Sequence, residues 1–253
     1  MTPSRIVPAL ATRWSIALAA ALAGSAAQGA EISENANMWI SYFGDHPLGT
    51  NRWGVHLEGQ ARLAQMGDTW QQILIRPGIN YTLTPSITLS GGYCFIEQFP
   101  YGEFPVAHDY PIHASWEQVA YTHPAFGLNW MHRARLEQRW IGQMHKVGES
   151  WDVADYRYEN RVRYMLRTTI PLTRDKNWYV ALWDEVFVNF GDNVLRNDFD
   201  QNRATIALGR NLSKYVRLEV GFMEQTLQRR GGNVWEHNHT LSVSLFSKAP
   251  FGN

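Results

Sequence analysis

The sequence has little cysteine, little charge and no long apolar run in its main part, and each shortage excludes a class of protein. Cys94 is the only cysteine among 253 residues, so an intrachain disulfide is excluded. Charged residues make up 18% of the chain, below the ~25% of ordinary soluble domains. Beyond residue 30, no stretch reaches the roughly 20 apolar residues of a membrane-spanning helix, which excludes a helical membrane protein. Lysine plus arginine balance aspartate plus glutamate at 23 each, which argues against a nucleic-acid partner.

The first thirty residues differ from the rest of the chain. A short basic start precedes an apolar run at 14–23 (WSIALAAALA), and small residues follow at 24–30 (GSAAQGA). This order is typical of a secretory signal peptide cleaved between Ala27 and Glu31, the alternative being a buried N-terminal helix. No cysteine lies near the cleavage region, so lipid attachment there is not expected. The predicted division is residues 1–30 as signal peptide and residues 31–253 as one domain.

Strict alternation of apolar and polar residues dominates the remaining chain. In residues 52–64, Trp53, Val55 and Leu57 share one face, while His56 and Glu58 lie on the other. A helix would mix the two sets on every face, so the period of two indicates β-strands. Ten strands are predicted, at 52–64, 70–82, 87–98, 113–123, 127–140, 154–170, 177–190, 199–209, 214–227 and 233–246.

The connections between these strands fall into two alternating groups. Short turns are predicted at 84–86, 123–127, 171–177 and 211–214, and more polar or longer loops at 65–69, 100–112, 142–153, 191–198 and around 231–232. Short turns at one end and long loops at the other are typical of outer-membrane barrels, in which the short turns face the periplasm.

Residues 37–43 (NMWISYF) form one further apolar and aromatic stretch. If both termini lie in the periplasm, the number of strands must be even. We therefore expect an all-β fold, a single antiparallel transmembrane β-barrel of about ten strands, with 37–43 as a plug or edge segment at the periplasmic mouth. A barrel of twelve strands, using this stretch and one unrecognised strand, is the alternative.

Three features favour an apolar face that meets lipid over one that forms a soluble core. The strands exceed the usual five or six residues of soluble proteins and match the roughly 9–11 residues of a tilted membrane strand. Aromatic residues gather at both strand ends, with Trp53 and Trp178 near the short turns and Trp140 and Tyr158 near the longer loops. The last strand ends in an apolar-aromatic pair near the C-terminus. The residues predicted to face lipid include Leu57, Leu136 and Leu218. A soluble periplasmic β protein is the alternative.

The chain resembles a family of bacterial outer-membrane barrels catalogued as domain of unknown function 2490. The resemblance covers most of residues 37–246 and rests on these segments: Trp39, Arg133–Arg139 (RARLEQR), Tyr158–Arg167 (YENRVRYMLR), Trp183–Phe187 (WDEVF) with Asn189, Asn202-Arg203, and Arg217–Phe222 (RLEVGF) with Gln225. It implies a barrel fold and an outer-membrane location. It implies no agreed activity and no catalytic residue.

Arginines and glutamates alternate on the inward face of two neighbouring predicted strands, where basic residues outnumber acidic ones seven to two. Opposite residues of adjacent antiparallel strands lie about 5 Å apart, so the two rows form a ladder, and nearby strands can add Glu58. The ladder either fills a narrow lumen and stiffens the wall, or lines a constricted, anion-preferring pore or anionic-ligand site. The predicted lumen network is Arg62, Arg133, Arg135, Glu137, Arg139, Arg157, Glu159, Arg161, Arg163, Arg167, Glu185, Arg217 and Glu219.

Enzymatic and adhesive functions remain as alternatives. His113 with Ser115, or His237 and His239 with Ser242, supply Ser-His spacings for a lipid-modifying enzyme, but no G-x-S-x-G motif is present. The predicted loops could bind a surface partner. We expect no cofactor, no metal site and no nucleic-acid partner. The expected partners are outer-membrane lipids, the barrel-assembly machinery during biogenesis and a small anionic solute.

Overall fold

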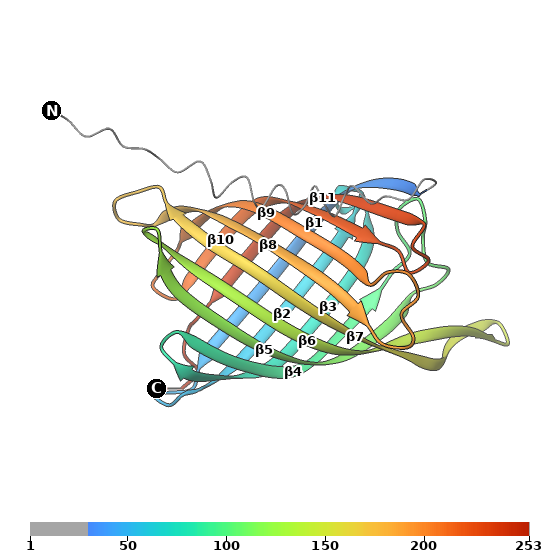
Figure 1. The fold of residues 1–253 in the computed structure, drawn as a ribbon, viewed down its shortest axis with the longest axis horizontal. Coiled ribbons are helices and arrows are strands. Elements are labelled where there is room, and N and C mark those ends of the chain that lie inside the picture. The colour runs from blue at the N-terminus through green and yellow to red at the C-terminus, as the bar shows by residue number, and fades with distance from the viewer. Residues whose placement is uncertain (1–29, 253) are drawn as a thin grey trace.

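All ten predicted strands and the 37–43 stretch lie in the wall of one closed β-barrel (Figure 1). The computed structural model describes residues 30–252, so the predicted signal peptide, apart from Ala30, lies outside the described residues. The strands are β1 (Glu31–Pro47), β2 (Trp53–Ala64), β3 (Thr69–Thr84), β4 (Ile87–Gln98), β5 (Tyr110–Ala125), β6 (Leu128–Val147), β7 (Ser150–Pro171), β8 (Trp178–Phe190), β9 (Phe199–Asn211), β10 (Val216–Gln228) and β11 (Val234–Ser247). Within residues 30–252, the one helical element is η1 (Gln65–Gly67), and no helix is long and apolar enough to cross a membrane.

The barrel closes through a parallel pair. Consecutive strands pair antiparallel from β1 to β11, and β1 then pairs parallel with β11 from Glu31↔Val234 to Gly44↔Ser247. Closure gives every strand two hydrogen-bonded neighbours, so the described wall has no free edge. The start of β1 and the end of β11 consequently lie at opposite ends of the barrel (Figure 1).

The predicted barrel is confirmed, and its eleven described strands agree with the predicted number of about ten, with twelve as the alternative. One detail of the prediction is wrong, because residues 37–43 belong to β1 and form wall rather than a plug. The argument for an even number assumed that every neighbouring pair is antiparallel and that both termini share one side. A parallel ladder also satisfies the hydrogen-bonding groups of the backbone, although slightly less favourably per residue. With one parallel pair, an odd number of strands can close the barrel, and the first and last strands then end at opposite sides.

The connections follow the predicted asymmetry, with one exception. Connections 48–52, 85–86, 126–127, 172–177 and 212–215 lie at the end we call the short-turn end, while 65–68, 99–109, 148–149, 191–198 and 229–233 lie at the end we call the long-loop end. The predicted loop 142–153 is instead a continuation of β6 and β7, which stay paired up to Val147↔Ser150. This hairpin projects beyond the barrel body (Figure 1, yellow-green).

The two faces of the wall are arranged as predicted for a membrane barrel. Ile75, Ile79 and Ile206 are each more than half exposed on the outside, whereas Arg76 and Glu137 are each 2% exposed inside. Leu57, Leu136 and Leu218 share the outward face and are partly exposed. The apolar side chains therefore cover the exterior, and the charged side chains fill the interior.

One sector of the interior is apolar. Leu74, Cys94, Ile112, Trp116 and neighbouring side chains on β3 to β6 pack together inside the wall. The Trp116 indole lies so close to β3 that a Cβ at Gly78 would be 2.6 Å from its ring. Glycine at this position lets the indole pack directly against the backbone, and the charged side chains occupy the remaining lumen.

Candidate functional site

Alternating positions of β6 and β7 carry the predicted ladder into the lumen. All thirteen predicted residues face the interior, and each is buried or half-buried. The two rows lie opposite each other as expected, for example at Arg135↔Arg163, Glu137↔Arg161 and Arg139↔Glu159. Arg135 and Arg163 carry like charges and face each other, so acidic side chains from other strands are needed to neutralise the ladder.

Glu137 is the centre of an ion-pair network that crosses the lumen. Its carboxylate accepts hydrogen bonds from Arg161 at 2.6 Å and Arg163 at 2.7 Å. Arg76 reaches across from β3, which is not a neighbour of β6, and donates to Glu137 at 3.2 Å and to Glu58 at 2.6 Å. Guanidinium groups suit this bridging because one planar fork serves two carboxylates. The network thereby ties distant sectors of the wall together.

A second group of ion pairs continues toward the short-turn end. Glu185 on β8 accepts from Arg163 at 3.0 Å and from Arg133 at 2.9 Å. Glu219 on β10 accepts from Arg167 at 2.5 Å. Each of these acids is buried, so each pair is shielded from bulk water and interacts more strongly than a surface pair.

Two cavities lie in the lumen formed by residues 30–252, one toward each end of the barrel. The short-turn cavity has a volume of about 410 Å³, and the long-loop cavity one of about 490 Å³. Trp39, Arg163 and Arg203 line both cavities, so these side chains form the partition between them. Trp39 is fixed by a 2.8 Å hydrogen bond from its indole Nε1 to Gln71 and by the Arg62 guanidinium, 4.1 Å from the ring centroid.

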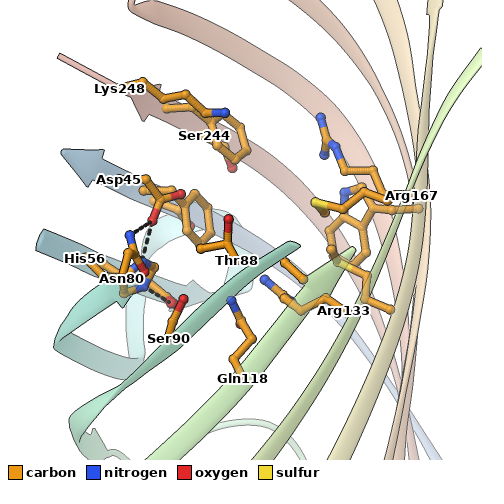
Figure 2. A pocket seen from close by; sticks show the side chains of 18 of the residues that line it. Asp45, His56, Asn80, Thr88, Ser90, Gln118, Arg133, Arg167, Ser244 and Lys248 are labelled. Atoms are coloured by element: carbon orange, nitrogen blue, oxygen red, sulfur yellow. Dashed lines mark hydrogen bonds and ion pairs between the residues drawn. The ribbon is translucent and has the colours of Figure 1, made fainter. Parts of the chain in front are cut away.

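Charged and polar side chains from opposite sides of the barrel line the short-turn cavity (Figure 2). Asp45 accepts hydrogen bonds from His56 and Asn80, each at 2.8 Å, on one side. Arg133 and Arg167 lie on the facing side. Six arginines and Lys248 line this cavity, against four carboxylates. Its surface is therefore basic overall.

The long-loop cavity is more strongly basic. Nine arginines line it, against two carboxylates, those of Glu159 and Asp200. The 99–109 loop contributes Tyr101, whose hydroxyl donates to Glu236 at 2.8 Å. Burial, followed by the charge of the Glu236 carboxylate, raises the pKa of Tyr101 above its ordinary value. Tyr101 therefore stays protonated and anchors this loop inside the mouth of the barrel.

Sequence reasoning missed several residues of this site. Arg76, Arg203 and Asp200 are central to it but were absent from the predicted network. Arg76 shares its face with Leu74, which lies in the apolar sector, so alternation gave no sign of a charged interior there. Trp39 was recognised as part of an unusual stretch, yet its role in the partition depends on contacts that alternation does not report.

The structure does not join the candidate Ser-His pairs. His113 contacts the hydroxyls of Tyr93 and Tyr156, whereas Ser115 donates to Gln138. His239 contacts Glu224 at 2.7 Å. Ser242 donates to the Gly221 carbonyl instead of bonding to either of the nearby histidines.

Comparisons with known proteins show the family. A solved structure described as the NanC porin aligns over 79% of this chain and 93% of its own, with a TM-score of 0.44 and 12% sequence identity. An uncharacterised protein of Methylorubrum extorquens is 27% identical over 241 residues, which cover 93% of this chain and 97% of that protein. The family described as protein of unknown function (DUF2490) matches residues 36–236, and the chain belongs to this family.

Proposed function

We propose that this protein is exported, inserted in the bacterial outer membrane, and forms a narrow channel that prefers small anions. The apolar exterior supports insertion in lipid, because the transfer of exposed aliphatic side chains such as Ile75 and Ile79 from water to lipid lowers the free energy. A signal peptide at residues 1–30 would direct the export. The long-loop end would then face outward and the short-turn end the periplasm.

The observation that carries the channel is the arrangement of the two cavities. They approach each other from opposite ends of the lumen and are separated by side chains, among them Trp39, Arg163 and Arg203. A partition made of side chains needs a smaller rearrangement to open than a folded segment would.

The charge of the lumen supports a preference for anions. Arginines outnumber carboxylates in both cavities, by nine to two at the long-loop end. A basic cleft with low-dielectric walls concentrates anions and repels cations, and rings of arginine are a known selective device in anion pores.

Planar lipid bilayers test this function. Purified full-length protein in a potassium chloride gradient should give discrete conductance steps. The sign of the reversal potential should show that chloride permeates more readily than potassium. Trp39→Ala, which removes most of the shared partition side chain, should raise the single-channel conductance. Trp140→Ala is the matched control, because Trp140 is 39% exposed on the outer face and lines neither cavity. The proposal would be overturned if neither the wild type nor Trp39→Ala gave conductance steps, or if the reversal potential showed a preference for cations.

A further inference from the structure

Three buried arginines in the long-loop cavity have no carboxylate partner among the described residues. Arg62, Arg139 and Arg203 are 6%, 9% and 7% exposed. No carboxylate oxygen of residues 30–252 lies within 4.0 Å of their guanidinium nitrogens. By contrast, Arg76 and Arg161 each lie within 3 Å of an acid. The lumen thus contains two populations of arginine, one paired and one unpaired.

Among the described residues, the unpaired arginines donate side-chain hydrogen bonds only to neutral amide oxygens. Arg62 donates to Gln60 at 2.8 Å and also to Gln72. Arg203 donates to Gln201 at 3.0 Å. An amide oxygen satisfies a donor geometrically but supplies no formal negative charge in contact with the guanidinium group, and a buried charge without a paired counter-charge is costly.

Arg139 adds a second, independent observation. Its guanidinium group makes one long hydrogen bond, 3.5 Å to Asn189, and its buried Nε has no hydrogen-bond partner among the described residues, as is also true of the Nε of Arg76 and Arg133. Buried donors in folded proteins are nearly always satisfied by protein or water. Arg139 differs from Arg76 and Arg133 in having no carboxylate in contact, and it lines the long-loop cavity, so a ligand in that cavity can supply its partner.

The remaining geometry indicates what that partner is. Arg62 and Arg203 both stack on the Trp39 ring, at 4.1 and 4.9 Å from its centroid, and this fixes them at the floor of the cavity. Stacked guanidinium groups keep their in-plane N–H donors available, and these donors match planar or tetrahedral oxyanions in pairs. A single halide would neutralise one of the three charges.

We propose that the long-loop cavity is a binding site for a compact oxyanion carrying two or more negative charges, held by Arg62, Arg139 and Arg203. The inference rests on the proposed function, in which this cavity is the outer entrance of the anion path. It specifies that the entrance holds a multivalent oxyanion rather than merely attracting small anions in general. The cavity volume, about 490 Å³, is sufficient for a small organic or inorganic anion.

Calorimetric titration of the full-length barrel in detergent tests the site without requiring conduction. Inorganic phosphate and citrate are the probes, and chloride at matched ionic strength is the reference. We expect saturable one-site binding of at least one probe and none of chloride. Loss of one charge-assisted contact in Arg139→Gln should weaken binding by about ten-fold or more. Absence of saturable binding of both probes would overturn the proposal.

Gln72→Glu provides a variant that keeps the shape of the side chain. The Gln72 amide oxygen already accepts a hydrogen bond from Arg62, so a carboxylate there would supply the missing counter-charge. Binding of the probe should fall by about ten-fold or more, although no arginine is removed. This variant decides the question if Arg139→Gln does not fold.

Arg217→Gln is the matched control. Arg217 lines only the short-turn cavity and lies 3.5 Å from Glu219. Its loss should therefore change the probe affinity by less than about two-fold, well below the roughly ten-fold effect expected for the loss of one direct contact. Equal weakening by Arg217→Gln and Gln72→Glu would mean general electrostatic attraction and would overturn the site. Binding without conductance would refute the channel alone, and anion conductance without binding would refute the site alone.

Discussion

Replacing Glu137 by glutamine should destabilise the barrel more than any other single loss of charge in the lumen. The carboxylate is 2% exposed and accepts four hydrogen bonds, two from Arg161 and one each from Arg163 and Arg76. Glutamine preserves the shape and one acceptor but removes the negative charge. Three guanidinium groups then lose their shared partner inside the protein.

The expected loss of stability depends on which acidic partners the three arginines keep when Glu137 is replaced. Arg76 retains Glu58, Arg161 retains Asp200, and Arg163 retains Glu185 on β8. None becomes fully isolated, so the cost is that of breaking one buried ion-pair centre rather than three. Removing one partner of such a centre typically costs about 3–5 kcal/mol, and we expect the free energy of unfolding to fall by that amount.

Denaturant unfolding in detergent, followed by tryptophan fluorescence, measures this free energy, provided that the slope against denaturant is unchanged by the substitution. Glu117→Gln is the control, because Glu117 is exposed on the outer face of the neighbouring strand and makes a single 3.3 Å contact with Gln138. It should change stability by no more than about 0.5 kcal/mol. A loss below about 1 kcal/mol in Glu137→Gln would refute the reasoning, because it would mean that desolvation cancels the attraction in this network.

Two further predictions address the wall. Gly209→Ala should cost about 1–3 kcal/mol, because a Cβ there would overlap the Tyr179 ring, whereas Gly59→Ala, with nothing near its Cβ, should be close to neutral in the same unfolding measurement. An epitope tag placed just before Glu31 should be detected by antibody on intact cells, while a tag after Asn253 should require permeabilised cells, because the parallel β1–β11 pair puts Glu31 and Ser247 at opposite ends. Detection of both tags only after permeabilisation would contradict the parallel closure in the membrane.

Much of the fold could be predicted from the sequence because a period of two is a local property. Each of the ten predicted strands matches one of β2 to β11, and the faces of Leu57 and Arg135 were assigned correctly. Which strands become neighbours at the closure is not local. The partner of β1 is β11, about 200 residues away, and neither strand carries a mark of parallel pairing in its own pattern.

The candidate site shows the same division between local and distant information. Alternation placed Arg133 to Arg167 on the inward face, but it could not identify the acids each arginine meets. Arg76 is an example, because its contact with Glu137 spans the lumen between strands that are not neighbours. The hairpin at 142–153 was missed because its polar residues suggested a loop, whereas pairing between β6 and β7 continues regardless of composition at the tip.

The division of the arginines into paired and unpaired groups separates stability from binding. The paired group converges on Glu137 and links β3 to β6, β7 and β8, so it holds opposite sides of the wall at a fixed distance. Apolar side chains could fill the same space, as they do around Trp116, and buried ion pairs are often no more stabilising than such packing. The paired group therefore explains the rigidity of the lumen but not its excess of arginine. That excess lies in Arg62, Arg139 and Arg203, whose hydrogen-bond acceptors are glutamine and asparagine rather than carboxylates. The proposed oxyanion would supply the negative charge that the described residues do not place in contact with these three guanidinium groups.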